Sequence, residues 1–259
     1  MNAINKAKVV LVCSDGDNTR ILYHGIKDTI NITTIIIEQK EKKGKFIKRR
    51  VKRLGLVKVA GQLLFQGMLV PVMRKLSASA VAKIFKDYDL NNSPMPETLI
   101  KRVLSVNSPD FIKQLNNADP DLVLVNGTRI ISEKTLNSIH CLVINVHAGI
   151  TPLYRGVHGA YWALANNDAE NCGVTIHAID KGIDTGSILA QDTIGPGPED
   201  NFITYPYLQF QKAIVLLQKI IPALLKGDVK FLQPPKGKSQ LWYHPTIWQY
   251  LYYRSKAVK

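Results

Sequence analysis

The sequence holds few cysteines and no paired-cysteine motif. Only three of its 259 residues are cysteine (Cys13, Cys141 and Cys172), an odd number at wide spacing. This pattern argues against a disulfide scaffold and a structural zinc site. Unpaired cysteines of this kind are typical of proteins in a reduced compartment, so we expect a cytoplasmic protein with no metal site.

The sequence also lacks a long uninterrupted run of apolar residues. No stretch approaches the roughly 18 such residues of a membrane-spanning helix. The first segment, residues 1–8, carries charge and leads directly into a short apolar stretch, which is not the pattern of a signal peptide. With 46% hydrophobic and 21% charged residues, the composition is that of a globular protein. We therefore expect neither a membrane span nor a signal peptide.

Acidic residues are scarce relative to basic ones, and the two are unevenly distributed. The chain has 34 Lys and Arg against 20 Asp and Glu, a net charge of +14. The excess lies in residues 1–100 and 201–259, whereas residues 101–200 are net acidic. Basic flanks attract nucleic acid, anionic lipid or phosphorylated small molecules. The densest run, residues 40–53, has nine cations and one anion; it is either a phosphate-binding segment or a solvated, mobile surface loop.

Short β-branched stretches alternate with helical patterns along the chain. Residues 7–13 and 32–37 are typical of buried strands, and residues 19–27 between them are typical of a helix. Strand, helix and strand in this order form a βαβ unit, which predicts a parallel sheet with helices on its faces. Further strands are expected at 103–106, 122–125, 142–145, 173–179 and 188–194. Further helices are expected at 54–73, 108–116, 132–138, 157–165 and 210–225.

These elements predict an α/β fold with a Rossmann-like, open, mostly parallel twisted sheet and helices on both faces. We assign residues 1–226 to one main domain with a basic insertion at 40–100, and residues 227–259 to a linker and an aromatic tail. In the tail, Pro245 fits the first turn of a helix that ends near Tyr253. Its expected apolar face comprises Ile247, Trp248, Leu251 and Tyr252. Because so short a helix is marginal in water, the tail should dock, preferably on its own domain and otherwise on a second subunit.

Polar side chains follow the predicted strand at 142–145. Asn145 and His147 lie two residues apart, so the alternation of a strand points both to one face. Ligands of open parallel sheets bind just beyond the carboxyl ends of the strands. Asp180 and Asp184 lie in a turn after another strand. An amide, an imidazole and a carboxylate together can perform acyl transfer. The alternative is that each residue only forms a turn or satisfies a local hydrogen bond.

Four segments together resemble the folate-dependent formyltransferase superfamily. They are residues 145–147 (NVH), 151–156 (TPLYRG), 173–177 (GVTIH) and 183–186 (IDTG). The superfamily includes glycinamide ribonucleotide transformylase, methionyl-tRNA formyltransferase and the sugar N-formyltransferases, and its motif is Asn-x-His, a Leu-Leu-Pro loop and a downstream Asp. The resemblance marks residues 1–226 as a formyltransferase-like catalytic domain. Residues 155–168 are most similar to the sugar N-formyltransferase branch.

The resemblance implies a role for each polar residue. Asn145 would hold the donor carbonyl and stabilise the oxyanion, His147 would relay the proton of the attacking amine, and Asp184 would orient His147 and accept a proton. His158 would contact substrate, with a simple helix-start role as the alternative. Asp180 would bind substrate or only shape its turn. The loop residues implied in donor and substrate binding are Ile150, Thr151, Pro152, Tyr154, Arg155 and Gly156.

The loop departs from the superfamily pattern. Where the family usually has Ser-Leu-Leu-Pro, this chain has Gly149, Ile150, Thr151 and Pro152. Two donors therefore stay open, formyl-tetrahydrofolate first and acetyl-CoA second. If the donor is a CoA thioester, cations of the 40–53 run are the first candidates for its phosphates, namely Lys48, Arg49 and Arg50.

The leading hypothesis is an N-acyltransferase, by preference a formyltransferase, that acts on a nucleotide-linked amino sugar in surface-polysaccharide (lipopolysaccharide) biosynthesis. We expect a homo-oligomer, with a dimer as the first choice. One alternative is formylation of methionyl-tRNA, for which the segment after Gln233 is too short to form a tRNA-binding barrel. Another is a non-catalytic RNA-binding protein, although the basic run contains only one aromatic residue, Phe46. Nucleic acid is therefore not the favoured partner.

Overall fold

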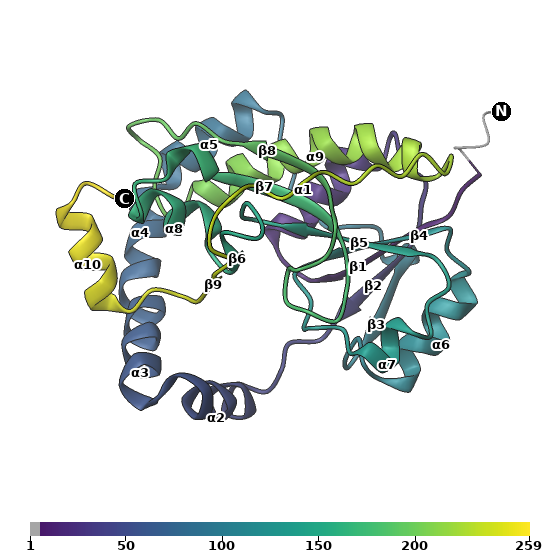
Figure 1. The fold of residues 1–259 in the computed structure, drawn as a ribbon, viewed down its shortest axis with the longest axis horizontal. Helices are drawn as coiled ribbons and strands as arrows, with labels where there is room; N and C mark the ends of the chain where they lie inside the picture. The colour runs from purple at the N-terminus through teal and green to yellow at the C-terminus, as the bar shows by residue number, and fades with distance from the viewer. Residues whose placement is uncertain (1–5) are drawn as a thin grey trace.

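The computed structural model describes residues 6–259 and is built around a seven-stranded sheet (Figure 1). The strand order is β3-β2-β1-β4-β5-β7-β8. The strands are β1 Val9–Ser14, β2 Ile32–Glu38, β3 Ile100–Val103, β4 Leu122–Asn126, β5 Leu142–His147, β7 Gly173–Ala178 and β8 Ile188–Thr193. The expectation of no signal peptide concerns residues 1–8, of which residues 1–5 lie outside the described part of the chain.

The sheet is parallel except at one end. β1 pairs in parallel with β2 and β4, β2 with β3, and β4 with β5. β7 runs antiparallel to β5, and β8 runs antiparallel to β7. The predicted α/β fold with an open, mostly parallel sheet is confirmed. Because β1, β2, β4 and β5 run in the same direction, their carboxyl ends meet at one edge of the sheet, where ligands of such folds bind.

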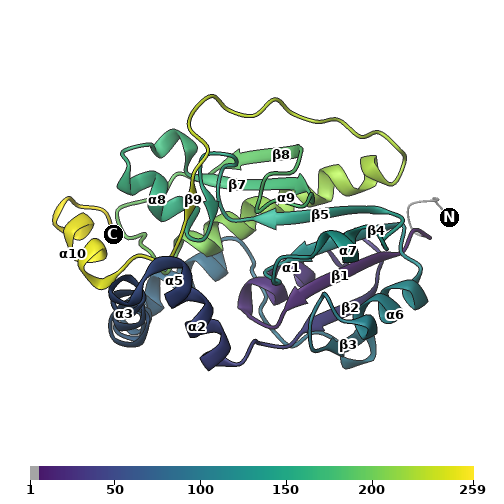
Figure 2. The ribbon, with the colours of Figure 1, turned by 60° about the horizontal axis from the view of Figure 1, so that its bottom comes forward.

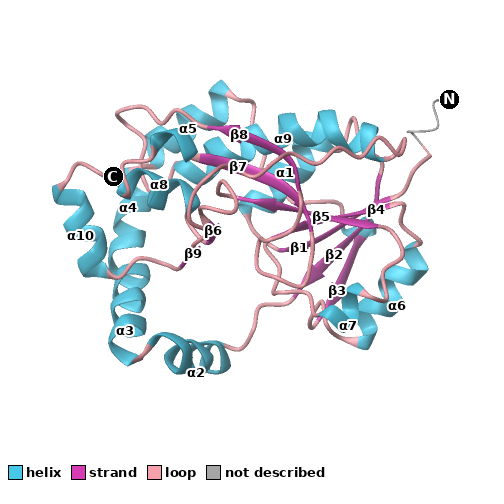
Figure 3. Ribbon diagram, in the orientation of Figure 1, coloured by secondary structure: helices cyan, strands magenta, loops and turns pink. Residues whose placement is uncertain are grey.

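Apolar side chains alternate between the two faces of the sheet. Each face is covered by helices (Figure 3). On one face, Leu11 packs in a core with α1 (Asp17–Ile26) and α9 (Tyr205–Leu224). On the other face, Val10 packs with α6 (Pro109–Ala118). The short helix α7 is Glu133–Leu136. Burial on both faces explains why these strands are continuous apolar runs in the sequence.

The edge strand β3 begins earlier than the sequence predicts. We expected a strand at 103–106, whereas β3 is Ile100–Val103. Its register follows from pairing with Ile35–Glu38 of β2. Lys101 and Arg102 within it are exposed, so the strand lacks the apolar pattern that marks the buried strands. The prediction was wrong because pairing, and not a local apolar run, determines where this strand lies.

A helical arm, residues 43–87, lies between β2 and β3. It consists of α2 Lys43–Leu54, α3 Leu56–Leu64, the π-helical turn η2 Phe65–Leu69, α4 Val70–Leu76 and α5 Ala78–Asp87. The interpretation of the basic run as a mobile loop is wrong for residues 43–54, which are helical. Figures 1 and 2 show α2 and α3 at a distance from the seven-stranded sheet. Among residues 6–259, one helical run, Leu56–Leu76, is long and apolar enough to cross a membrane by length and composition.

The aromatic tail docks on its own domain, which was the preferred expectation. β9 (Leu241–Trp242) pairs with β6 (Arg155–Gly156), and the ring of Trp242 stacks on Trp162 with 4.7 Å between centroids. The helix α8, Gly159–Ala165, carries Trp162. The remaining short helical turns are η3 Glu97–Leu99 and η4 Ala169–Asn171. The tail therefore belongs to the same folded unit as the sheet.

The tail helix α10 (Ile247–Ser255) buries a different face from the predicted one. Tyr250 is buried against Phe65, and its ring also stacks near Tyr161. Three of the four residues expected inside, Trp248, Leu251 and Tyr252, are exposed. The prediction was wrong because α10 has aromatic residues on both sides, so its own pattern does not specify the buried side. The side that is covered is the one that packs against the aromatic cluster formed by α8 and the arm.

Candidate active site

The pairing of β5 with β7 positions the polar residues at the carboxyl end of β5. In this pair Asn145 lies opposite His177, and His147 lies opposite Thr175. Asp184 lies in the turn between β7 and β8. The structure thus brings together the predicted residues Asn145, His147 and Asp184, and it adds His177, which was not predicted.

His147 is buried, and both of its ring nitrogens face oxygen atoms. Nε2 lies 2.7 Å from the carbonyl oxygen of Tyr154, so it carries a proton and donates to that oxygen. Nδ1 lies 3.4 Å from Oδ2 of Asp184. The bond from Nε2 fixes the orientation of the ring and leaves Nδ1 as the nitrogen that exchanges a proton beside a carboxylate.

Two groups, His147 and the Gly156 N–H, hold Asp184 as a carboxylate, and the ring of His177 lies near it. Its Oδ2 accepts a hydrogen bond of 2.9 Å from the Gly156 N–H, and its Oδ1 lies 3.6 Å from Nε2 of His177. Burial raises the pKa of Asp184, but the nearby His147 and the hydrogen bond from the Gly156 N–H outweigh it, and the pKa is lowered to about 2. The carboxylate is therefore charged at neutral pH and can stabilise a protonated His147.

His177 fixes the amide of Asn145. Nδ1 of His177 donates to its neighbour's carbonyl oxygen, that of Ala178, at 2.8 Å. In the neutral ring Nε2 is then an acceptor, and it receives a hydrogen bond of 3.1 Å from Nδ2 of Asn145. One amide N–H of Asn145 is used in this way, and the second is left to donate elsewhere. The sequence signal for His177 was its place in the GVTIH segment, but only the antiparallel register shows that it faces Asn145.

The loop after β5 packs tightly around His147. A Cβ on Gly149 would lie 2.4 Å from the carbonyl oxygen of Tyr154 and 2.8 Å from Nε2 of His147. This close approach leaves no room for a side chain at position 149. The Thr151 N–H donates to Oγ1 of Thr175 at 3.1 Å, which fixes the next part of the loop.

The rest of the loop is tied to the turn that carries Asp184. Arg155 donates from Nη1 to the carbonyl oxygen of Ile183 at 3.0 Å, and the Gly156 N–H binds Asp184 directly. The Tyr154 hydroxyl donates to Asp168 at 2.7 Å. Of the remaining predicted loop residues, Ile150 and Thr151 are buried, and Pro152 is half-buried. The loop is therefore a fixed part of the site.

Asp180 and His158 contact other groups. Asp180 is exposed, and its Oδ1 accepts from the Gly182 N–H at 2.9 Å and from the Thr185 hydroxyl at 2.7 Å, so it shapes its own turn. Nε2 of His158 lies 2.8 Å from Nδ1 of His244 in the tail. Burial, and secondly His244, lower the pKa of His158 well below its usual value. His158 thus belongs to the contact between α8 and the tail.

The predicted cations Lys48, Arg49 and Arg50 lie on α2 in the arm. Arg49 pairs with Glu41 at 2.9 Å. Arg50 donates to Oε1 of Gln62 at 2.8 Å, and burial lowers its pKa. These contacts tie α2 to Glu41 and to α3, and none of them involves the group around His147.

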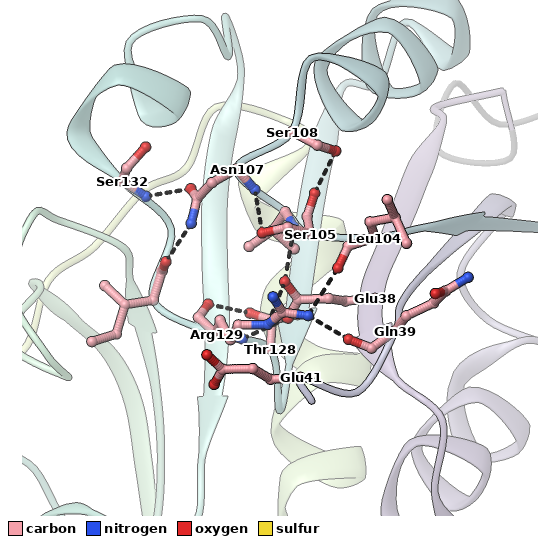
Figure 4. A network of polar contacts seen from close by, with 12 residues as sticks. Glu38, Gln39, Glu41, Leu104, Ser105, Asn107, Ser108, Thr128, Arg129 and Ser132 are labelled. Carbon is pink, nitrogen blue, oxygen red and sulfur yellow. Dashed lines mark hydrogen bonds and ion pairs between the residues drawn. The ribbon is translucent and has the colours of Figure 1, made fainter. Parts of the chain in front are cut away.

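A second polar network lies at the carboxyl end of β2 (Figure 4). Glu38 is buried, with Oε1 accepting from the Val106 N–H and Oε2 from the Arg129 N–H, both at 2.8 Å. The Arg129 guanidinium pairs with Glu38 at 3.1 Å and also donates to the carbonyl oxygens of Leu104 and Gln39. Both carboxylate oxygens are used, so this network joins the loops after β2, β3 and β4.

The group around His147 has the parts of an acyl-transfer site. Asn145 offers a free amide N–H for a developing oxyanion, and His147 can take a proton beside the charged Asp184. The three cysteines are free. Within residues 6–259 no group of three or more His, Cys, Asp or Glu side chains is placed to hold a metal ion.

Comparison with protein families gives a match over most of the chain. The model of the formyl transferase family, described as "Formyl transferase", matches residues 2–205. The chain is 33% identical over 144 residues to a methionyl-tRNA formyltransferase of Azobacteroides pseudotrichonymphae, a match that covers 54% of this chain and 44% of that protein. It is 30% identical over 130 residues to the GDP-perosamine N-formyltransferase of Brucella melitensis, with 50% of each chain covered.

A solved structure shares the fold. The 4-N formyltransferase from Francisella tularensis superposes with a TM-score of 0.56 at 17% identity, covering 90% of this chain and 76% of that one. At this identity the similarity concerns the fold alone. The chain spans about half the length of the curated relatives it matches.

Proposed function

From the premise that this chain belongs to the formyl transferase family, we propose that it transfers a formyl group to the amino group of a sugar carried on a nucleotide. The observation that carries the proposal is the pairing of His147 with the ionised Asp184 at 3.4 Å, beside Asn145, at the edge of the sheet where ligands bind. The membership covers the residues that form this group, since the matched segment is 2–205.

In the proposed reaction, the sugar amine forms a C–N bond with the formyl carbon while the bond from that carbon to the donor nitrogen breaks. Asn145 donates its free amide N–H to the negative charge that develops on the formyl oxygen. His147 takes up the amine proton at Nδ1, and Asp184 stabilises the resulting imidazolium. The proton then passes to the departing nitrogen, which leaves His147 ready for the next cycle.

The loop at 149–156 has features that suit a bound donor. Oγ1 of Thr151 and Nε of Arg155 are buried and have no hydrogen-bond partner among residues 6–259, so polar atoms remain for a ligand. Pro152, Arg155 and Gly156 are the half-buried residues of the loop, and the carbonyl of Thr151 is already held by Gln191 at 2.8 Å. We propose formyl-tetrahydrofolate as the donor, which supplies the formyl group when bound. Acetyl-CoA is the alternative, with Lys48, Arg49 and Arg50 as its candidate phosphate contacts.

The proposed acceptor is a nucleotide-linked amino sugar. It is supported by the GDP-perosamine N-formyltransferase among the relatives and by the sugar-branch pattern at residues 155–168. Surface-polysaccharide biosynthesis in the cytoplasm is the proposed setting, and a homodimer is the proposed assembly. Methionyl-tRNA is the competing acceptor, because another relative is a methionyl-tRNA formyltransferase.

The proposal is tested by offering each donor with each acceptor and weighing the products. Formyl-tetrahydrofolate and acetyl-CoA are incubated separately with a panel of nucleotide-linked amino sugars and with methionyl-tRNA, with His147→Asn as the inactive control. A gain of one formyl group on a sugar nucleotide, absent in the control, is the expected result. Formylated methionyl-tRNA with unreacted sugars would overturn the acceptor, and acetylated sugars would overturn the donor.

A further inference from the structure

The helical run Leu56–Leu76 has a continuous apolar face that the rest of the chain leaves uncovered. Of the 18 consecutive residues with the highest mean hydropathy in this run, only 22% are buried. The exposed apolar residues include Leu56, Leu63, Leu64, Met68, Val72 and Leu76. Leu64, Met68, Val72 and Leu76 recur every four positions, and Leu56 and Leu63 are seven apart, so each of these two sets follows one side of the helical run. An exposed apolar face of this extent on a soluble domain marks an interaction site.

The opposite face of the same run is fixed to the domain. Phe65 is fully buried against Phe202 and Tyr250. Gln62 is also buried, and its Nε2 donates to the carbonyl oxygen of His244 at 2.7 Å. Crossing a bilayer would require these contacts to break and would place Gln62 in hydrocarbon. The run is therefore built to lie along a surface.

The tail helix extends the apolar face with aromatic residues. Trp248, Leu251 and Tyr252 on α10 are exposed. α10 lies beside α3 in Figures 1 and 2, and a Cβ on Gly61 of α3 would lie 2.2 Å from the Trp248 ring. Trp and Tyr are enriched where a protein meets the boundary between lipid and water. The exposed face is thus apolar along α3 and α4, and the amphipathic side chains of Trp248 and Tyr252 on α10 lie beside it.

The arm is strongly basic, and Asp87 at its end is its one acidic residue. Residues 42–86 contain thirteen Lys and Arg and no Asp or Glu. Eight of these cations lie at 42–53, directly before the apolar run, and α2 has no buried residue. A basic, exposed helix followed by an apolar face is the pattern of a segment that lies in the surface of an anionic membrane.

We propose that the arm, residues 43–87, together with the exposed side of α10, docks on an anionic lipid bilayer. The apolar face of Leu56–Leu76 enters the boundary of the headgroups, and the cations of α2 contact the lipid phosphates. A second copy of the chain fits this face less well. A two-fold interface places the same patch on both subunits, so it would bring together two arms that each carry twelve cations and one acidic residue, Asp87.

The test measures binding of the full chain to vesicles by co-sedimentation. One set of vesicles is phosphatidylcholine alone, and the other is phosphatidylcholine mixed with phosphatidylglycerol. We expect binding to the mixed vesicles that weakens as salt is added, and little binding to phosphatidylcholine. Absence of binding to the mixed vesicles overturns the proposal.

Paired variants locate the surface. Leu64→Gln with Met68→Gln should weaken vesicle binding at least tenfold, whereas Val229→Gln with Phe231→Gln, at exposed positions of the linker, should leave it unchanged. A second pair of double variants tests the charge. The variant with Lys48→Gln and Lys52→Gln on α2 should bind vesicles more weakly than the control with Lys113→Gln on α6 and Lys134→Gln on α7. Because all eight side chains are exposed, thermal unfolding of each variant should match the parent. Equal binding by arm variants and controls overturns the proposal.

Sedimentation velocity in the absence of lipid tests the alternative that a second copy of the chain covers this face. The proposal expects the subunit number to be the same in the parent and in the Leu64→Gln, Met68→Gln variant. A parent dimer that this variant dissociates, together with no binding to the mixed vesicles, would assign the face to self-association and overturn the proposal.

Discussion

The imidazole of His147 and the carboxylate of Asp184 lie 3.4 Å apart, although one ends β5 and the other lies beyond β7. The Gly156 N–H donates to the same carboxylate, and the Tyr154 carbonyl oxygen accepts from His147, so the loop between them contacts both side chains. The geometry makes Asp184 a charged partner of a histidine whose other nitrogen is already hydrogen-bonded. Several measurable consequences depend on this pair and on the residues around it.

Replacing either member of the pair should stop turnover without unfolding the chain. We expect His147→Asn and Asp184→Asn each to lower turnover about 100-fold or more, the usual effect of removing a positioned acid–base group. Asp192→Asn, which changes another carboxylate paired with a cation, Lys212, is the matched control and should stay active. The measurement is kcat with thermal unfolding alongside. Near-normal turnover in His147→Asn or Asp184→Asn would contradict the assignment.

Asp184 should make stability depend on acidic pH. Its pKa is about 2 in the folded chain and near 3.8 in the unfolded chain, so the unfolded chain binds more protons between these values. The resulting stabilisation, about 2 kcal/mol, is complete above about pH 5 and is lost as the pH falls toward 2. Denaturant unfolding at a series of pH values should show this loss in the parent. The loss should be absent in Asp184→Asn, and an identical slope in both proteins would refute it.

His177 should act by positioning Asn145. Its Nε2 accepts the Asn145 amide at 3.1 Å, so His177→Ala frees that amide to rotate. We expect kcat to fall about tenfold or more while KM changes little, because the loss is one of orientation. His177→Gln offers an acceptor oxygen nearby and should recover part of the loss. If both variants keep the parent kcat, Asn145 does not need this contact.

Gly149 should not tolerate a side chain. A Cβ there would lie 2.4 Å from the Tyr154 carbonyl oxygen, which accepts the His147 hydrogen bond. Gly149→Ala should therefore lower the free energy of unfolding by about 1–3 kcal/mol and reduce kcat as well. Gly67→Ala, on the arm where nothing lies within 4 Å of an added Cβ, is the control for stability. A fully active, equally stable Gly149→Ala protein would show that the loop has room to move.

Tyr250 should hold the tail on the domain. It is 6% exposed and packs on Phe65, whereas Tyr252 two residues later is 54% exposed. Tyr250→Ala should lower the free energy of unfolding by about 3–5 kcal/mol because it leaves a cavity in an aromatic cluster. Tyr252→Ala should change it by less than about 0.5 kcal/mol. Equal effects of the two substitutions in denaturant unfolding would show that the tail helix is not docked in this way.

The buried strands and the polar residues after β5 were predictable from the sequence, because both depend on local order. Continuous apolar runs mark strands that are buried on both faces, and they give β1, β2, β4 and β5 close to their observed bounds. Asn145 and His147 are two residues apart, so any strand places them on one face. The bounds of the edge strand β3 were missed because they depend on its pairing with β2. The buried side of α10 was missed because it depends on the residues that pack against it.

The tertiary structure alone decided which side chains meet. Antiparallel pairing of β7 with β5 brings His177 into contact with Asn145, and the turn after β7 brings Asp184 next to His147. No local sequence pattern specifies this register. The tertiary structure also placed His158 against His244 of the tail, and it placed Lys48, Arg49 and Arg50 on α2 in the arm. A sequence specifies periodicity and residue chemistry along the chain, whereas contacts between distant segments depend on how the whole core packs.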